Sequence, residues 1–184
     1  MANKGRVLNK RIGLFGGTFN PIHYGHIKMA EAARKEYKLD IVYFIPCGTP
    51  PHKLKKDLLP AKKRFDLLKE AIKGEKYFKV LDVEIKKKTK AYTINTVKQF
   101  LGIYSNKSLK IQLYFLIGKD EFENLHTWKN FKELAKMVTF LVLPRKSKKT
   151  KEKKSLKTKI PSLKFKFVHT KPIDISSTEI RKKM

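Results

Sequence analysis

Two histidines, His23 and His26, stand three residues apart shortly after a glycine pair, Gly16-Gly17. At that spacing both imidazoles lie on one face of a helix, beside backbone N–H groups that have no partner within the first turn. Imidazoles, these N–H groups and the hydroxyl of Thr18 are all donors, and a helix N-terminus favours negative charge. The glycines allow the backbone to come close to a ligand. Together these residues predict a site for an anionic phosphate.

A phosphate site of this kind suits transfer of a nucleotidyl group. A phosphate that attacks the α-phosphorus of a nucleoside triphosphate is already ionised, so the reaction needs little acid or base catalysis. Catalysis then consists of holding two reactants in line and stabilising the charge that develops on the α-phosphoryl oxygens. His23, His26 and the distant Arg181 supply donors for that charge. No serine or cysteine nucleophile is required.

A zinc site is the competing interpretation of the two histidines. A structural zinc site needs four ligands, and no Cys or further His lies near His23 and His26 to complete it. We therefore predict no protein-bound metal. The glycine pair matches neither the Walker loop nor the GxGxxG fingerprint of dinucleotide-binding proteins. Taken alone it is ambiguous, because many strand-to-helix turns contain glycine.

Strand-like and helix-like patterns alternate along the chain. Apolar runs predict buried strands at 12–15, 41–45, 111–117, 137–143 and 165–168, and alternation predicts an edge strand with one wetter face at 81–85. Helical spacing predicts helices around 23–37, 65–72 and 94–101 and the start of a last helix at 175–179. This order predicts an α/β, Rossmann-like fold with an open, mostly parallel sheet and helices on both faces. The loops GGTFNP, CGTPPHK, GKDE and LPRK then share the carboxyl edge of the sheet, where ligands bind.

The charge of the chain is strongly positive. It carries 44 Lys+Arg against 16 Asp+Glu, a formal net charge of +28, but only six of these residues are arginines. The many lysines fall at expected solvent faces, which favours a general surface bias over a dedicated nucleic-acid interface. The segment 145–159 has nine positive residues and one acid, which predicts a flexible Lys-rich loop. Without interleaved aromatic residues, any nucleic-acid binding there should be non-specific and sensitive to salt.

The cysteine content and the N-terminus bear on the compartment. The single Cys47 cannot form an intramolecular disulfide, which favours a reducing compartment. The basic N-terminus has no apolar segment behind it, and no stretch approaches the length needed to cross a bilayer. We expect a cytoplasmic protein with no membrane partner and one domain over 1–184. No feature of the sequence indicates an oligomeric state.

The order of the motifs resembles that of a known superfamily. GGTFNPIHYGH resembles the GTFDPxHxGH signature of the nucleotidyltransferases, and ISSTEIR resembles their ISxTxIR signature. Between them, VYFIPCGTPPHK, AYTINTV and YFLIGKDEFENLHTWKN look like the intermediate motifs of the bacterial nicotinate-nucleotide adenylyltransferases. That family joins nicotinate mononucleotide to the adenylyl group of ATP and releases pyrophosphate. The resemblance covers 11–181 and implies ATP and nicotinate mononucleotide as substrates, with Mg²⁺ bound through the nucleotide phosphates.

The resemblance also assigns roles by position. It makes His23 and His26 the catalytic pair on the ATP phosphates. The ATP-binding residues that it implies are Gly16, Gly17, Thr18, Phe19, His23, His26, Ser177, Thr178 and Arg181. The substrate-binding residues that it implies are His52, Lys53, Tyr92, Thr93, Gly118, Asp120, Trp128 and Arg145. Among these, Trp128 would stack on the pyridine ring and Asp120 would contact a ribose.

Three positions depart from the family pattern. Asn20 stands where Asp is usual, Ala91 replaces the usual Ser of the SYT segment, and Met184 follows Arg181 by only three residues, so we expect a short C-terminal helix. The alternatives within the superfamily are a nicotinamide mononucleotide, phosphopantetheine or cytidylyl transferase. A basic nucleic-acid-binding protein is the alternative from another class.

Overall fold

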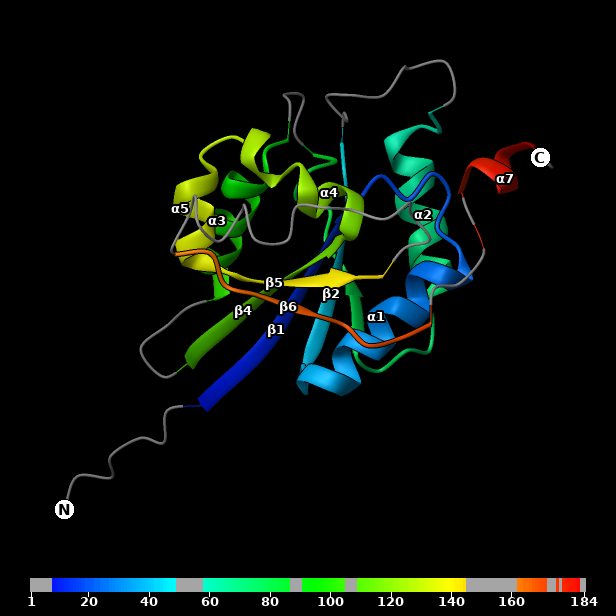
Figure 1. Ribbon diagram of the computed structural model, residues 1–184. Coiled ribbons are helices and arrows are strands. Elements are labelled where there is room, and N and C mark those ends of the chain that lie inside the picture. Colours follow the sequence, from blue (N-terminus) through cyan, green and yellow to red (C-terminus); the bar gives the residue numbers. More distant parts are fainter. Residues whose placement is uncertain are drawn as a thin grey trace.

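The apolar run before the glycine pair forms a central strand of a six-stranded sheet. The computed structural model describes residues 8–48, 58–86, 91–104, 109–144, 162–171, 175 and 177–182. Within these ranges all strand pairs are parallel, in the order β3-β2-β1-β4-β5-β6 (Figure 1). The strands are β1 (Leu8–Gly17), β2 (Ile41–Pro46), β3 (Phe78–Val80), β4 (Leu109–Gly118), β5 (Thr139–Leu143) and β6 (Phe165–Phe167). The predicted α/β parallel sheet is confirmed.

Helices cover both faces of this sheet. They are α1 (Tyr24–Tyr37), α2 (Ala61–Ala71), α3 (Thr93–Tyr104), α4 (Lys119–Glu123), the 3₁₀ turn η2 (Leu125–Thr127), α5 (Phe131–Met137) and α7 (Ser177–Lys182). Figure 1 shows α1 and α2 on one side of the strands and α3 and α5 on the other. This arrangement follows from the strand order, because the chain leaves β1 in both directions and right-handed crossovers in opposite directions place their helices on opposite faces.

Successive side chains of a strand point to opposite faces of the sheet, so the molecule has a separate core on each face. In β4, Leu113, Phe115 and Ile117 belong to the core under α3 and α5, whereas Tyr114 and Leu116 belong to the core under α1 and α2. All five side chains are buried. Burying a large apolar side chain contributes roughly 1.5–3 kcal/mol, so the two cores together hold the strand ends in place.

The prediction of a strand at 81–85 is wrong. The edge strand β3 lies earlier, and residues 83–86 form a turn in which Lys86 N–H donates to the Asp82 carbonyl at 3.1 Å. Glu84 was expected on a wetter face, but it is buried and accepts a hydrogen bond from the Thr96 hydroxyl at 2.7 Å. A carboxylate that gains such a partner can leave water, and alternation of residue types does not reveal that partner.

The prediction for β5 is right in its core and wrong at its start. Met137 ends helix α5, and the strand begins only at Thr139. An apolar residue at the end of a buried helix resembles one at the start of a buried strand. The Lys-rich segment 145–159 and the chain after residue 182 lie outside the described residues, so the single-domain prediction for 1–184 stays a prediction. In the described part of the chain no helix is long and apolar enough to span a bilayer.

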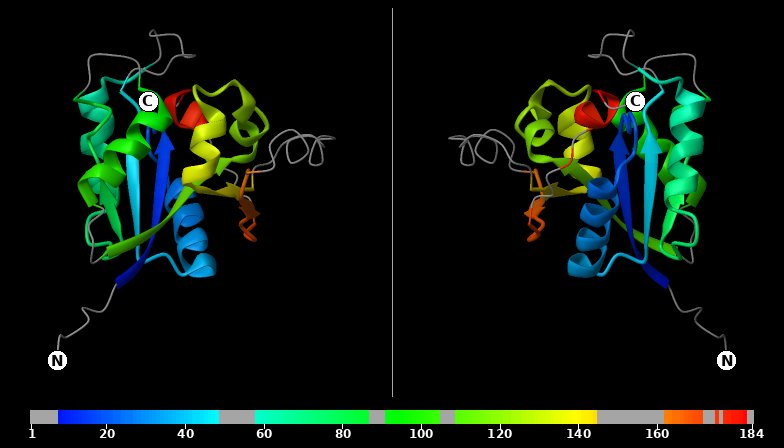
Figure 2. Two further views of the ribbon diagram at one scale, coloured as in Figure 1. Left: turned by 90° about the vertical axis from the view of Figure 1, so that its left-hand side faces the viewer. Right: turned by 90° about the vertical axis from the view of Figure 1, so that its right-hand side faces the viewer.

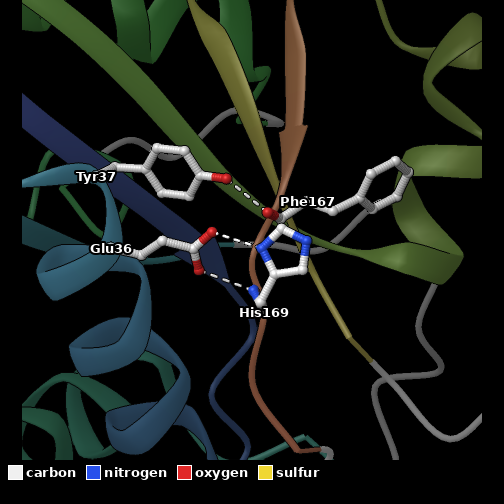
Figure 3. A network of polar contacts seen from close by, with 4 residues as sticks. All are labelled: Glu36, Tyr37, Phe167 and His169. Carbon is white, nitrogen blue, oxygen red and sulfur yellow. Dashed lines mark hydrogen bonds and ion pairs between the residues drawn. The ribbon is translucent and has the colours of Figure 1, made fainter.

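The last strand is tied to the far end of α1. Figure 3 shows Glu36 and Tyr37 of α1 facing Phe167 and His169. The Tyr37 hydroxyl donates to the Phe167 carbonyl at 2.5 Å, and Glu36 accepts from the His169 backbone N–H at 2.8 Å. Burial, followed by the hydrogen bond with Glu36, raises the pKa of Tyr37 to about 12. These contacts join β6 and the residues just after it to the C-terminal end of α1.

Candidate active site

The predicted site residues gather at the carboxyl edge of the sheet. Neighbouring strands β1 and β4 lead to helices on opposite faces, so their carboxyl ends flank the crevice in which such sheets bind ligands. Gly16 and Gly17 end β1 and are half-buried. Gly118 ends β4 beside them in the sheet. Figure 2 shows α7 beyond the carboxyl end of β1.

The two histidines lie ring against ring at the head of α1. His23 is the N-cap of the helix and His26 is its third residue. Their ring centroids are 3.8 Å apart, and the His23 backbone N–H donates to Nδ1 of His26 at 3.3 Å. An acceptor nitrogen carries no hydrogen, so the neutral His26 ring has its proton on Nε2. The local fold therefore makes Nε2 of His26 a donor, as an anionic phosphate requires.

Aromatic side chains fix the orientation of His26. The ring of Phe19 meets His26 edge to face at 5.2 Å, and Phe15 lies behind both at 6.2 Å from His26. Phe19 is only 2% exposed, so its ring forms part of the core and a ligand can meet only its backbone. Its φ of 44° is left-handed, which costs a non-glycine residue on the order of 1–3 kcal/mol. Such strain is typical of turns whose shape serves a site.

The second signature docks onto the first. The Arg181 guanidinium donates through Nη1 to the Asn20 carbonyl at 2.6 Å, and the Ser177 hydroxyl donates to the Pro21 carbonyl at 3.0 Å. Thr178 is exposed on the same helix, and its hydroxyl accepts from Arg181 Nη2 at 3.4 Å. The structure thus brings the residues predicted for the triphosphate to the turn before His23, although about 160 positions separate them in the sequence.

The described residues predicted for the mononucleotide lie at the start of α3, in and just before α4, and at the end of η2. Tyr92 precedes α3, Thr93 begins it, and the Lys129 ammonium lies 4.4 Å from the Tyr92 ring centroid. Trp128 caps η2, and its half-buried ring meets Phe115 edge to face at 5.9 Å. Trp128 is thus anchored by the core on one side while part of its surface stays accessible.

Asp120 lies in the first turn of α4. A Cβ at Gly118 would come within 2.6 Å of the carboxylate Oδ1 of Asp120, so a larger residue there would displace this carboxylate. The backbone carbonyl of Asp120 accepts from the Asn124 side chain at 2.9 Å. His52, Lys53 and Arg145, the remaining predicted residues, lie outside the described residues.

Comparison with known proteins identifies the family. A family model described as cytidylyltransferase-like matches residues 14–183. A probable nicotinate-nucleotide adenylyltransferase of Thermoanaerobacter sp. (strain X514) is 40% identical over 95% of this chain and 82% of its own length. One of Shouchella clausii (strain KSM-K16) is 38% identical over 95% of this chain and 84% of its own. The chain belongs to the cytidylyltransferase-like family, among the nicotinate-nucleotide adenylyltransferases.

A solved structure supports the fold of this adenylyltransferase family member. Plasmodium falciparum nicotinic acid mononucleotide adenylyltransferase complexed with NaAD superposes with a TM-score of 0.74, over 94% of this chain and 83% of that one. At 22% identity the likeness concerns the fold alone. The strand order and the parallel sheet of this adenylyltransferase are therefore shared with a protein of distant sequence.

One polar residue at the carboxyl edge was not predicted from the sequence. Arg64 of α2 is fully buried, and its guanidinium donates to three backbone carbonyls at the carboxyl edge. The sequence does carry a signal, because Arg64, Leu68 and Ile72 recur every four residues, which places Arg64 in line with apolar positions of the helix. A basic residue in the apolar stripe of a helix indicates a buried charge with specific partners.

Proposed function

We propose that this chain transfers the adenylyl group of ATP to nicotinate mononucleotide, giving nicotinate adenine dinucleotide and pyrophosphate. The observation that carries the proposal is the contact between the two signature segments. Arg181 and Ser177 donate to consecutive carbonyls of the turn that leads into His23. This contact brings the helix that carries Arg181 to the turn that leads into the head of α1, where imidazole and backbone donors suit the binding of a triphosphate.

The reaction needs positioning more than proton transfer. A phosphate oxygen of the mononucleotide attacks the α-phosphorus of ATP and forms the new P–O bond. The bond from the α-phosphorus to the bridging oxygen breaks, and pyrophosphate leaves with that electron pair. His23 and the Nε2–H of His26 would donate to the α-phosphoryl oxygens, where negative charge increases. Donors that are already fixed in place do not have to reorganise as the charge develops.

Magnesium fits this site only as a companion of the nucleotide. In the described part of the chain no three His, Cys, Asp or Glu side chains gather in a way that could hold a metal ion. The groups at the head of α1 are N–H donors, which suit anions. Mg²⁺ would therefore be bound through the nucleotide phosphates, where it supplies charge neutralisation and Lewis acidity.

The opposite wall of the crevice is proposed to hold the mononucleotide. Trp128 presents an aromatic surface backed by Phe115, which suits stacking on a pyridine ring. Tyr92 and Thr93 lie at the start of α3, where backbone N–H groups favour a carboxylate. Asp120 would contact a ribose, and His52, Lys53 and Arg145 remain predictions for this substrate.

The proposal is tested by measuring pyrophosphate release from Mg-ATP with two acceptors in parallel. We expect nicotinate mononucleotide to be consumed with a kcat/KM at least tenfold above that of nicotinamide mononucleotide. The reverse ratio would support the nicotinamide enzyme, and no release with either acceptor would contradict the proposal. The His23→Ala variant serves as the background control, because it removes a proposed donor, and its circular dichroism spectrum is compared with wild type to check the fold.

We also propose that the enzyme works in the cytoplasm with these two nucleotides as its partners, and with no specific nucleic acid. Arg64 and Arg181 donate to backbone carbonyls at the carboxyl edge, and the histidines at the head of α1 offer further donors there, whereas the Lys-rich segment 145–159 lies outside the described residues. Filter binding of a mixed-sequence RNA at low and near-physiological salt tests this. Binding that persists near physiological salt would contradict the absence of a nucleic-acid partner.

A further inference from the structure

Arg64 is a buried guanidinium whose three nitrogens all donate to backbone carbonyls. Nε donates to Leu59 at 2.9 Å, Nη1 to Thr18 at 2.7 Å and Nη2 to Gly48 at 2.8 Å. The side chain is 0% exposed. Burial lowers the pKa of Arg64, and the neighbouring Cys47 acts in the opposite direction. A buried charge is tolerated only with such partners, so the guanidinium and the carbonyls depend on one another.

The three carbonyls belong to separate segments of the carboxyl edge. Thr18 lies in the turn after β1, between the glycine pair and the histidines. Gly48 lies two residues beyond the end of β2, and Leu59 lies just before α2. One planar side chain therefore spans both connections that flank the proposed nucleotide site.

A second hydrogen bond also joins the turn after β1 to the residues just before α2. The side-chain oxygen of Asn20, which is 5% exposed, accepts from the Leu59 backbone N–H at 2.9 Å, and the Asn20 carbonyl accepts from Arg181. On the far side of Gly48, a Cβ would stand 2.4 Å from the Glu84 carbonyl, so the backbone is confined there as well. The turn after β1 is thus fixed to α2 through Arg64 and to α7 through Arg181.

We propose that Arg64 is a positioning residue, which sets the distance between the turn after β1 and the start of the β2–α2 connection so that both substrates meet in line. This inference rests on the proposed function. A guanidinium has a rigid fork of donors, which fixes directions as well as distances. Apolar side chains occupy the two positions that continue its stripe, Leu68 and Ile72, and an apolar residue at 64 would fill the space without directing the loops.

The test compares Arg64→Met with Leu68→Ala. Methionine keeps most of the volume and removes all donors, whereas Leu68→Ala leaves a cavity one helical turn away and removes no hydrogen-bonding side chain. We expect Arg64→Met to lower kcat/KM for both substrates by roughly 100-fold, the scale that misplacement of reacting groups produces. We expect Leu68→Ala to stay within twofold of wild type at a temperature where both variants are folded.

Hydrogen exchange supplies a readout that needs no substrate. We expect Arg64→Met to accelerate exchange at 16–23 and 46–48 while residues 113–117 of β4 keep their protection, because the opening is local. Leu68→Ala should accelerate exchange only in proportion to its loss of global stability. This readout can fail while pyrophosphate release with nicotinate mononucleotide succeeds, or the reverse, so the two proposals can be separated.

Two results would overturn the inference. One is an Arg64→Met enzyme whose kcat/KM stays within twofold of wild type. The other is a loss of activity that follows global stability in the same way as for Leu68→Ala. If Arg64→Met does not fold, Arg64→Lys carries the same comparison, since an ammonium keeps the charge but lacks the fork that reaches all three carbonyls. A folded Arg64→Lys enzyme with full activity and unchanged exchange would equally overturn it.

Discussion

Basic side chains lie at both the carboxyl edge and the amino edge of the sheet, that is, at the two ends of its strands. Their burial and their partners differ between the two edges. At the carboxyl edge, Arg64 and Arg181 donate to backbone carbonyls at 2.6–2.9 Å. At the amino edge, Lys10 lies 3.7 Å from Asp40 with 46% of its side chain exposed. That edge borders a cavity of about 720 Å³, which is lined by Asn9, Lys10, Arg11, Lys38, Asp40, Lys110, Ile111 and Gln112.

The difference lies in burial and in the partners of each charge. Water and salt screen an exposed ammonium, so an exposed ion pair contributes about 0–1 kcal/mol. Leaving a buried polar group without its hydrogen-bond partner costs roughly 1–3 kcal/mol, and more where the group is charged. The net charge of +28 therefore says little about function. The cationic side chains that bear on function are those that the fold places against backbone carbonyls at the carboxyl edge.

The largest effect should come from the donors at the head of α1. We expect His23→Ala to lower kcat by roughly 100- to 1,000-fold, because removing one preorganised donor from a developing negative charge has effects of this size. Steady-state pyrophosphate release at saturating substrates measures it. His169→Ala is the matched control, since this exposed imidazole lies at the opposite end of α1. Equal losses in both variants would contradict the assignment.

Arg181 should come next. We expect Arg181→Gln to lower kcat/KM for ATP by roughly 10- to 100-fold, because a charged donor and the docking of α7 on Asn20 are both weakened. Lys182→Gln removes an equal charge from the next, exposed residue and should change kcat/KM less than twofold. If the two variants behave alike, net charge rather than placement governs ATP binding.

A smaller effect is expected at the contact between Glu36 and His169, where Oε1 of Glu36 lies 2.7 Å from Nδ1 of His169 (Figure 3). Burial acts to raise the pKa of Glu36, but the hydrogen bonds from His169 outweigh it and lower the pKa overall. Because the pKa of Glu36 is lower in the folded state than in the unfolded state, the ionised carboxylate stabilises the folded state at neutral pH. This stabilisation is lost as the pH falls through the lowered pKa.

We therefore expect Glu36→Gln to lower the free energy of unfolding by at most about 1 kcal/mol at pH 7. The gap from wild type should close as the pH falls below about 4. Urea unfolding at pH 7 and at pH 3 measures both values. A gap that is as large at pH 3 as at pH 7 would show that the carboxylate charge is not its source.

The smallest effect should come from the amino edge. We expect the triple substitution of Lys10, Lys38 and Lys110 by Gln to change kcat/KM less than twofold, because these side chains line the cavity at the edge opposite the crevice. Pyrophosphate release at two salt concentrations checks this. A tenfold loss at near-physiological salt would remove the distinction between the two edges.

Much of the fold follows from local patterns. The run from Ile12 to Phe15 and the run from Ile111 to Ile117 predict the two central strands, and Ile94 with Val97 predicts α3. These predictions succeed because a buried parallel strand is apolar on both faces and a helix repeats every 3.6 residues. The turn at 83–86 escaped prediction because buried Glu84 has its partner, Thr96, on another element.

The candidate site, like the fold, could be predicted from the sequence only in part. The residue types and order around His23, His26 and Arg181 predict the phosphate chemistry, since donor character belongs to the side chains themselves. The sequence alone also determines the alternation of strands and helices, and with it the parallel sheet. The tertiary structure decides that Arg64 is buried and joins Thr18, Gly48 and Leu59. A charge can be buried only where carbonyls from distant segments converge on it, and that convergence exists only in the folded chain.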